Sequence, residues 1–226
     1  MVDVSIILYT NNKKTNFKRC LDSLVNQTNR NIEIIVLSSD ITDSYKSIVN
    51  NYNDDRIIYT SGSKSMEEMI NNSLKKIHGE YVYFISEDDY LEKNAIASVV
   101  KRLKKNKVDI LFTNYYRRVN NKNKKINILS FMDTFLKKKN VFKDINLSLY
   151  NKFFYSETLK HNKIKVTLDD KNEEESFLLK CDSIGKLDKA VVYHTSNDKQ
   201  GKKKDIKTSI IITIAFLALF LVGLFS

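Results

Sequence analysis

The chain has 226 residues, which is the size of one ordinary domain with additional sequence or at most two small domains. Its hydrophobic share of 42%, with 12 Phe and 12 Tyr, is enough for a packed core and excludes a wholly disordered chain. The net charge of +11 indicates an anionic neighbour, and nucleic acid, an anionic membrane surface or a phosphorylated small molecule would each qualify. We interpret the two distant cysteines, Cys20 and Cys181, as reduced core residues.

The first half of the chain alternates between short β-branched runs and segments with helical periodicity. Strands are predicted over residues 4–8, 32–37, 56–59, 81–85 and 108–113, with a helix after each of the first four. Parallel strands need such crossover connections. The order therefore predicts an α/β fold with a Rossmann-like, mostly parallel sheet covered by helices on both faces.

The pattern is less regular after residue 116. Residues 117–125 are basic and rich in Asn, which predicts a loop or an irregular hairpin that could cover a ligand at the sheet edge. Short helices are expected over residues 131–136, 152–159 and 173–181, and a closing strand over 187–194.

The last nineteen residues, 208–226, carry no charge and as a helix would span the ~30 Å hydrocarbon core of a bilayer. A buried helix of a soluble domain would normally show a polar stripe, and this segment has none. Five lysines precede it, so the positive-inside rule predicts that the domain before it faces the cytoplasm. No signal peptide is expected at the N-terminus. We therefore expect a folded domain over 1–197, a basic linker over 198–207 and a C-terminal transmembrane helix over 208–226.

Three acidic residues, Glu87, Asp88 and Asp89, follow the predicted strand 81–85. Open α/β sheets bind ligands at the carboxyl ends of their strands, where these side chains would lie. Neighbouring carboxylates repel one another unless a cation or hydrogen-bond donors gather them, so the cluster indicates a site for a hard divalent metal ion. The alternative is a solvated acidic turn.

Three blocks of sequence resemble the family 2 glycosyltransferases of the GT-A fold. They are VSIIL from Val4, RCLDSLVNQTNRNIEIIVL from Arg19 and HGEYVYFISEDDYLEKNAI from His78. Weaker matches, YNKFFYSETL and NEEESFLLK, extend the resemblance over nearly all of residues 1–197. The resemblance implies an inverting transfer of a sugar from a nucleotide-diphosphate donor to a hydroxyl group, assisted by Mg²⁺ or Mn²⁺.

The resemblance also implies which residues would hold the metal. In relatives an Asp-x-Asp motif at the end of the fourth strand holds the ion on the donor diphosphate, and here the motif reads Ser86, Glu87, Asp88. Asp88 is therefore the implied metal and donor ligand, and Glu87 could substitute for the missing first Asp. His194 is a candidate third contact, with a packed core histidine as the alternative.

The remaining site residues follow from the same resemblance. Relatives carry Glu-Asp near the start of a late helix, which matches Glu173 and Glu174, and Glu174 is the candidate general base. A surface acid that compensates the helix dipole is the alternative. The two Asp that read the donor's base and ribose in relatives are Ser38 and Ser39 here, which lack the charge of a carboxylate. Asn71 remains as a donor contact.

The sequence thus predicts a membrane-anchored glycosyltransferase that uses a nucleotide-sugar donor and a glycan or lipid-linked acceptor. Tethering would confine the enzyme to the plane of a lipid-linked substrate and raise its effective concentration. The alternative is a catalytically inactive GT-A protein that binds anionic glycans or lipid headgroups, which the serines at positions 38, 39 and 86 favour. Nucleic acid is not an expected partner, because only the charge supports it.

Overall fold

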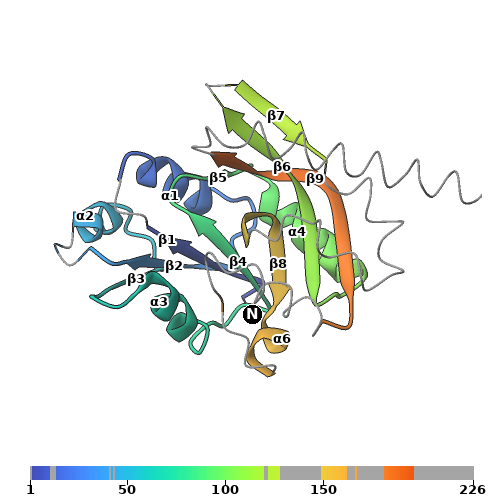
Figure 1. The fold of residues 1–226 in the computed structure, drawn as a ribbon, viewed down its shortest axis with the longest axis horizontal. Coiled ribbons are helices and arrows are strands. Elements are labelled where there is room, and N and C mark those ends of the chain that lie inside the picture. Colours follow the sequence, from blue (N-terminus) through green and yellow to red (C-terminus); the bar gives the residue numbers. More distant parts are fainter. Residues whose placement is uncertain are drawn as a thin grey trace, which may run out of the picture. The chain divides into compact units, whose positions relative to one another are not determined.

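The computed structural model describes residues 2–10, 14–40, 42, 44–119, 122–127, 149–161, 166 and 181–195. Within these residues the chain forms one sheet of nine strands with helices on both faces (Figure 1). The expected helix over 131–136, nearly all of the one over 173–181, the linker 198–207 and the predicted membrane segment 208–226 lie outside the described residues. No helix formed by the described residues is long and apolar enough to cross a bilayer.

The described strands and helices have the following bounds. The strands are β1 (Val4–Tyr9), β2 (Ile32–Ser38), β3 (Ile57–Ser61), β4 (Tyr81–Ser86), β5 (Tyr90–Leu91), β6 (Ile110–Val119), β7 (Lys122–Ile126), β8 (Lys152–Tyr155) and β9 (Ile184–Thr195). The helices are α1 (Phe17–Val25), α2 (Ser44–Asn50), α3 (Met66–Ser73), α4 (Ala95–Lys105) and α6 (Ser156–His161), with a 3₁₀ turn η2 (Leu149–Asn151) before β8.

One half of the sheet is parallel, as the sequence predicts. Its strand order is β3-β2-β1-β4, and β1 pairs in register with β2 on one side and with β4 on the other. β1, β2 and β4 are buried over almost their whole length, because helices cover both of their faces. This burial explains why these strands read as continuous apolar runs rather than alternating ones.

The prediction of a mostly parallel sheet is wrong for the other half, so the sheet is mixed. β8 pairs antiparallel with both β4 and β6, β5 with β9, and β7 with β6, and only β6 and β9 run parallel. Residues 152–155, expected to begin a helix, form β8. Phe153 stacks on Tyr83 with ring centroids 4.4 Å apart, and this cross-strand packing outweighs the local helical pattern.

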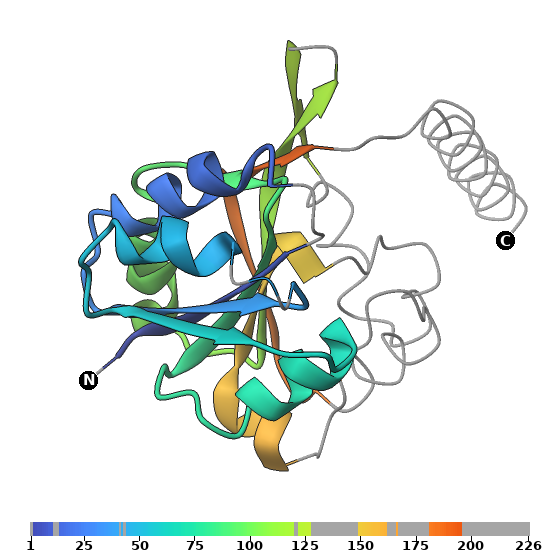
Figure 2. The same ribbon diagram turned by 90° about the vertical axis from the view of Figure 1, so that its left-hand side faces the viewer.

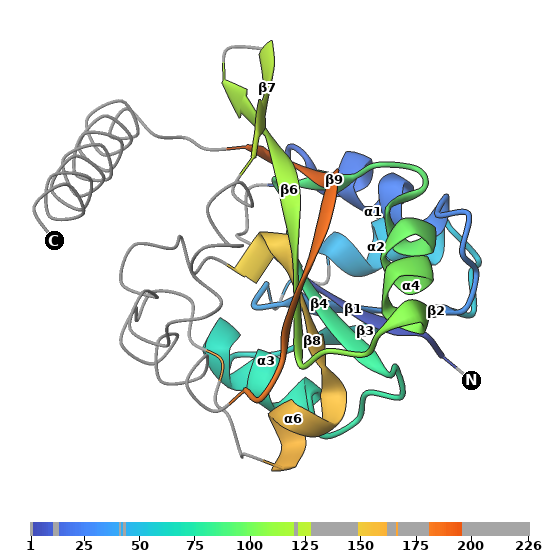
Figure 3. The same cartoon turned by 90° about the vertical axis from the view of Figure 1, so that its right-hand side faces the viewer.

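Two apolar cores lie on opposite faces of the sheet. Alternate residues of β1 point to opposite faces, so that Ile6 packs with α1, α2 and α4, whereas Ile7 packs with α3 and α6. Figure 3 shows α1, α2 and α4 on one side of the sheet and α3 and α6 on the other, and Figure 2 shows the same layers from the opposite side. The predicted covering of both faces by helices is confirmed.

The buried carboxylate of Glu33 connects β1, β2 and the residues before β4, at the end of the sheet where the parallel strands begin. Glu33 in β2 is 6% exposed and accepts hydrogen bonds from the Ser5 hydroxyl at 2.5 Å and from the His78 backbone N–H at 2.7 Å. The Gly79 N–H donates to the Ser5 hydroxyl at 2.8 Å. A Cβ atom on Gly79 would lie 2.3 Å from the backbone nitrogen of Ser5, so only glycine fits at this approach.

We predict that Gly79→Ala lowers the free energy of unfolding by about 1–3 kcal/mol, because the added methyl group would displace the β1 backbone. Gly62→Ala is the matched control, since nothing lies within 4 Å of a Cβ at that position. Urea unfolding of both variants would check this, and equal midpoints for the two would contradict the close approach.

Glu33 also predicts a pH dependence of stability. Burial works to raise its pKa, but the hydrogen bonds from the His78 N–H and the Ser5 hydroxyl outweigh burial and hold the pKa below its usual value. The ionised carboxylate therefore stabilises the fold above the unfolded pKa of about 4.3, and this contribution is lost as the pH falls below it.

Glu33→Gln should thus lower the free energy of unfolding by roughly 1–3 kcal/mol at neutral pH, with a gap to wild type that narrows in acid. Denaturant titrations at several pH values would measure that gap. Glu68→Gln, at an exposed position of α3, is the control that should change little at any pH. A gap for Glu33→Gln that is the same at all pH values would refute the role of the charge.

Candidate active site

The acidic turn lies at the carboxyl edge of the parallel strands, directly after β4. Its three side chains have different surroundings: Glu87 is 0% exposed, Asp89 is 2% exposed and Asp88 is half-buried. Residues that are adjacent in the sequence are therefore divided among three separate sets of contacts. Neither the expected gathering of the three carboxylates at one metal site nor the alternative of a solvated acidic turn describes this arrangement.

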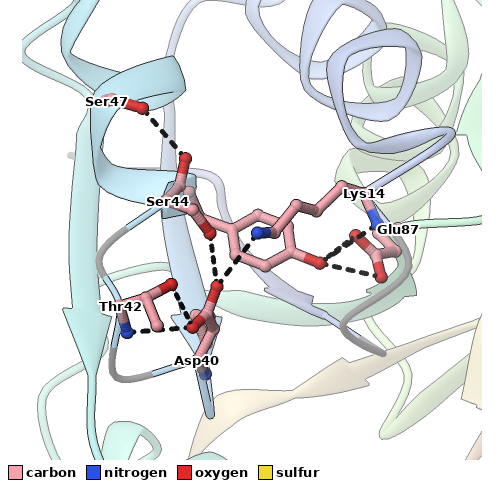
Figure 4. Close-up of polar contacts among 8 residues, drawn as sticks. Lys14, Asp40, Thr42, Ser44, Ser47 and Glu87 are labelled. Atoms are coloured by element: carbon pink, nitrogen blue, oxygen red, sulfur yellow. Dashed lines mark hydrogen bonds and ion pairs between the residues drawn. The ribbon is translucent and has the colours of Figure 1, made fainter.

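Glu87 points into the protein beneath the turn. Its two carboxylate oxygens lie 2.9 and 3.2 Å from the hydroxyl of Tyr45 in α2, which donates to them (Figure 4). Burial, and then the neighbouring carboxylate, raise the pKa of Tyr45, so its hydroxyl stays protonated as a donor. Glu87 therefore links the end of β4 to α2 through this hydrogen bond. The contact with a nucleotide-sugar donor that was predicted for Glu87 would have to compete with the Tyr45 hydroxyl.

The two predicted serines at the end of β2, Ser38 and Ser39, also differ from one another. Ser38 is fully buried and its hydroxyl accepts a hydrogen bond from the Asp40 backbone N–H at 3.1 Å, while Ser39 is half-buried at the edge. The sequence reasoning stopped at these two serines and missed Asp40, the next residue. Asp40 lies 3.3 Å from the Lys14 ammonium (Figure 4).

Asp40 is held in the ionised state by several donors. It accepts hydrogen bonds from the Ser44 hydroxyl and from the backbone N–H and hydroxyl of Thr42, at 2.9 and 2.6 Å for the latter two. The bonds from Ser44 and Thr42 hold the pKa of Asp40 well below its usual value. An anionic side chain thus lies at this edge of the sheet, directly after Ser38 and Ser39.

Asp88 is positioned by the first turn of α1 and the residue before it. The Asn16 side-chain amide donates to Asp88 Oδ1 at 2.9 Å, and the Arg19 guanidinium donates to the Asp88 backbone oxygen at 3.0 Å. Both contacts were missed from the sequence. They could have been suspected, because the helix that follows β1 starts at the same edge as the turn that follows β4.

Asp89 contacts His194, the residue predicted as a third contact at the metal site. The His194 Nδ1 atom lies 3.1 Å from each carboxylate oxygen of Asp89, and the Thr195 N–H donates to Asp89 at 2.9 Å. The imidazole also stacks on Tyr150 with ring centroids 3.8 Å apart. Because Nδ1 faces the carboxyl group of Asp89, Nε2 is the ring nitrogen that could hold a metal ion.

Asn71 lies elsewhere, on α3. Its amide nitrogen donates to the backbone oxygens of Glu67 and Val166 at 2.8 and 2.9 Å, and its oxygen accepts the Val166 N–H at 2.8 Å. These bonds fasten Val166 to α3, and the predicted donor contact of Asn71 stays a prediction. The candidate base Glu174 and its neighbour Glu173 lie outside the described residues.

Comparison with known proteins decides the family. Residues 5–166, which make up more than half of the chain, match the family described as Glycosyl transferase family 2. The chain belongs to glycosyl transferase family 2. The resemblance carried by the three sequence blocks is confirmed, since the match includes β1, β2 and the acidic turn after β4.

Relatives of this family 2 chain include an Escherichia coli protein described as UDP-Glc:alpha-D-GlcNAc-diphosphoundecaprenol beta-1,3-glucosyltransferase WfaP. The two are 33% identical over 115 residues, which cover 50% of this chain and 46% of WfaP. The family 2 chain thus spans less than half the length of that relative.

Two solved structures share the fold. S. aureus TarS 1-349 in complex with UDP has a TM-score of 0.68 at 21% identity, over 86% of this chain and 61% of the TarS 1-349 chain. Mannosyltransferase PcManGT from Pyrobaculum calidifontis, in complex with GDP-Man and Mn2+, has a TM-score of 0.61 at 17% identity, over 88% of this chain and 58% of PcManGT. At these identities the likeness shows the fold alone, a mixed α/β sheet of the GT-A type.

The described residues of the family 2 domain partly fit a divalent metal ion. They contain no group of three or more His, Cys, Asp and Glu side chains that could hold one. Asp88 supplies a carboxylate, and the carboxylate-bound imidazole of His194 is the arrangement common among metal-ligating histidines. Mg²⁺ is often bound by one or two protein ligands together with substrate phosphates, so a small donor set fits an ion that arrives with its nucleotide.

The hydrogen bond between Glu87 and Tyr45 predicts how the loss of the Tyr45 hydroxyl affects stability. Tyr45→Phe leaves a buried carboxylate without the Tyr45 hydroxyl and should lower the free energy of unfolding by about 1–3 kcal/mol. Tyr52→Phe is the matched control, because it removes a tyrosine bond to Asp22, whose side chain is 40% exposed, and should have a smaller effect. Urea unfolding of both variants would check the difference, and equal effects would contradict the structural role.

Proposed function

We propose that this chain transfers a sugar from a nucleotide-diphosphate donor to a hydroxyl of a glycan or lipid-linked acceptor. The observation that carries the proposal is the family 2 match over residues 5–166, on a fold that presents Asp88 at the carboxyl edge of its parallel strands. The TarS structure contains UDP, and WfaP is described as acting on a diphosphoundecaprenol-linked sugar. The TarS structure supports a nucleotide donor for this chain, and WfaP supports both a nucleotide donor and a lipid-linked acceptor.

The donor would bind at the edge formed by the ends of β1, β2 and β4. Asp88 and His194 would hold Mg²⁺ or Mn²⁺, and Ser38, Ser39 and Asn71 are the proposed donor contacts. The ion would supply positive charge that stabilises the departing diphosphate. Mn2+ accompanies GDP-Man in PcManGT, which supports this choice. Asn16 and Arg19 would orient Asp88 through the bonds they make to it.

The proposed reaction is an inverting displacement. It needs a carboxylate on the face opposite the leaving group, close enough to take the proton of the acceptor hydroxyl as the new bond forms. Glu174, with Glu173 beside it, is the proposed base, because the pair matches the acids that relatives carry at the start of a late helix.

Membrane anchoring is part of the proposal. Residues 208–226 would span the bilayer, residues 198–207 would link them to the domain 1–197, and the lysines of the linker would keep that domain on the cytoplasmic side. The anchor would hold the enzyme in the plane where a lipid-linked acceptor lies.

A second candidate is a catalytically inactive protein of the same fold that binds anionic glycans or lipid headgroups. The burial of Glu87 and the pairing of Asp40 with Lys14 favour it, because both acids are already engaged within the protein. The two candidates differ in one measurable property, the dependence of nucleotide binding on a divalent cation.

We predict that a matching nucleotide diphosphate or its sugar raises the melting temperature of the full chain in Mn²⁺ and not in a chelator, because binding to the folded state stabilises it. Asp88→Asn should abolish that rise and lower sugar transfer by about 10²–10³, the loss typical for one charge-stabilising group. Thermal shift and donor hydrolysis across a set of nucleotide sugars would measure both effects.

Asp55→Asn is the control, since it removes one acid at an exposed position outside the acidic turn. It should keep the metal-dependent rise. Indifference of the wild-type chain to every nucleotide, with and without Mn²⁺, would favour the inactive binding protein.

A further inference from the structure

The hairpin of β6 and β7 is strongly basic. Residues 114–127 contain no acidic residue and five cationic ones: Arg117, Arg118, Lys122, Lys124 and Lys125. The three lysines are exposed and the two arginines are half-buried. Figures 2 and 3 show this hairpin projecting beyond the helices that cover the sheet. We call the segment 114–127, which carries these five cationic side chains, the basic hairpin.

The pairing within the basic hairpin sets like charges against each other. Arg117 lies directly opposite Lys124 in the antiparallel register, and like charges at such positions destabilise a strand pair. Among the described residues β7 pairs with β6 alone, and lysines on an edge strand discourage pairing with other chains. Arg118 of the inner strand donates a hydrogen bond to the Tyr90 hydroxyl at 3.3 Å, whereas the three lysines of β7 are exposed. The lysines are therefore the side chains of the hairpin that can face an anionic surface.

The chain leaves the described fold beside this hairpin. β9 runs parallel to β6, with His194 opposite Arg117 and Thr195 opposite Arg118, and the described part ends at Thr195. Residues 196–207 separate this point from the uncharged segment 208–226. Even fully extended, a linker of this length reaches only about 40 Å, at roughly 3.3–3.6 Å per residue.

We propose that the basic hairpin docks on the anionic headgroups of the membrane that anchors residues 208–226. The inference rests on the anchor in the proposed function, which would keep the hairpin within reach of the bilayer. Anionic lipids attract basic side chains only within about a Debye length, roughly 8 Å at physiological salt, so the contact must be direct.

Docking would also orient the candidate active site. Tyr116 of the hairpin stacks on Tyr193 with centroids 4.6 Å apart, and Tyr193 stacks on Tyr90 at 4.4 Å, next to Asp89 in the sequence. His194 and Thr195 contact Asp89 itself. The hairpin is therefore connected to the acidic turn through β9 and Tyr90. Docking of the hairpin on lipid would hold that turn near the membrane surface, where a lipid-linked acceptor lies.

The test uses the full chain reconstituted in phosphatidylcholine vesicles, with and without phosphatidylglycerol. A fluorophore on Asn123→Cys would report contact with nitroxide-labelled headgroups, and the native Cys20 and Cys181 are buried from the label. We expect strong quenching with phosphatidylglycerol, and quenching reduced to the level of neutral vesicles in about 1 M salt, where the Debye length is ~3 Å.

The triple variant Lys122→Glu, Lys124→Glu and Lys125→Glu should lose the lipid-dependent quenching. Its matched control is Lys101→Glu, Lys104→Glu and Lys105→Glu in α4, which changes the net charge equally at three exposed positions and should keep the quenching. Circular dichroism would establish that both variants fold. Quenching that is independent of lipid charge, or lost equally in both variants, would overturn the proposal.

Alkaline carbonate extraction of the same vesicles tests the membrane anchor separately from the docking of the hairpin. Release of the chain by carbonate would refute the anchor and the docking with it. Retention of the chain without quenching by anionic lipid would refute the docking alone. The metal-dependent donor binding of the proposed function is measured without vesicles, so its outcome is independent of both.

Discussion

The alignment of β1 with β4 is the constraint on which the candidate site depends. Tyr9 at the end of β1 pairs with Ser86 at the end of β4, and the Glu87 N–H continues the ladder by donating to the Tyr9 oxygen at 3.1 Å. The acidic turn therefore begins at a fixed point. Because α1 is the next element after β1, its N-terminal end lies at the same edge of the sheet, where Asn16 and Arg19 hold Asp88. One strand-helix unit thus positions the residue that we propose as metal ligand.

The turn after β4 divides its charges by function. Glu87 is buried against Tyr45 and stabilises the packing of α2, and Asp89 fixes the orientation of His194. Asp88 alone is half-buried at the edge. A single half-buried carboxylate suits the ion that we propose, because such an ion would bring further ligands with its substrate.

Much of the fold could be predicted from the sequence, because β1 to β4 and the helices between them are long, periodic and locally consistent. β8 could not, since Lys152 to Tyr155 become a strand only through pairing with β4 and β6. The family and the position of the acidic turn could also be predicted from the sequence. The opposite directions of Glu87 and Asp88 were not, and neither was the bond between Lys14 and Asp40, because both depend on contacts between segments distant in the sequence. The roles of Glu173 and Glu174 stay predictions.

The stack of Tyr116, Tyr193 and Tyr90 has a spectroscopic consequence. The chain has no tryptophan, so tyrosines dominate its near-ultraviolet absorption. Tyr90, Tyr193 and Tyr116 are stacked nearly parallel, with interplanar angles of 10° and 15°, and rings this close couple their electronic transitions. Near-ultraviolet circular dichroism reports fixed side-chain packing. The near-ultraviolet spectrum of this protein should therefore contain a contribution from the stacked tyrosines that changes when the hairpin moves away from β9.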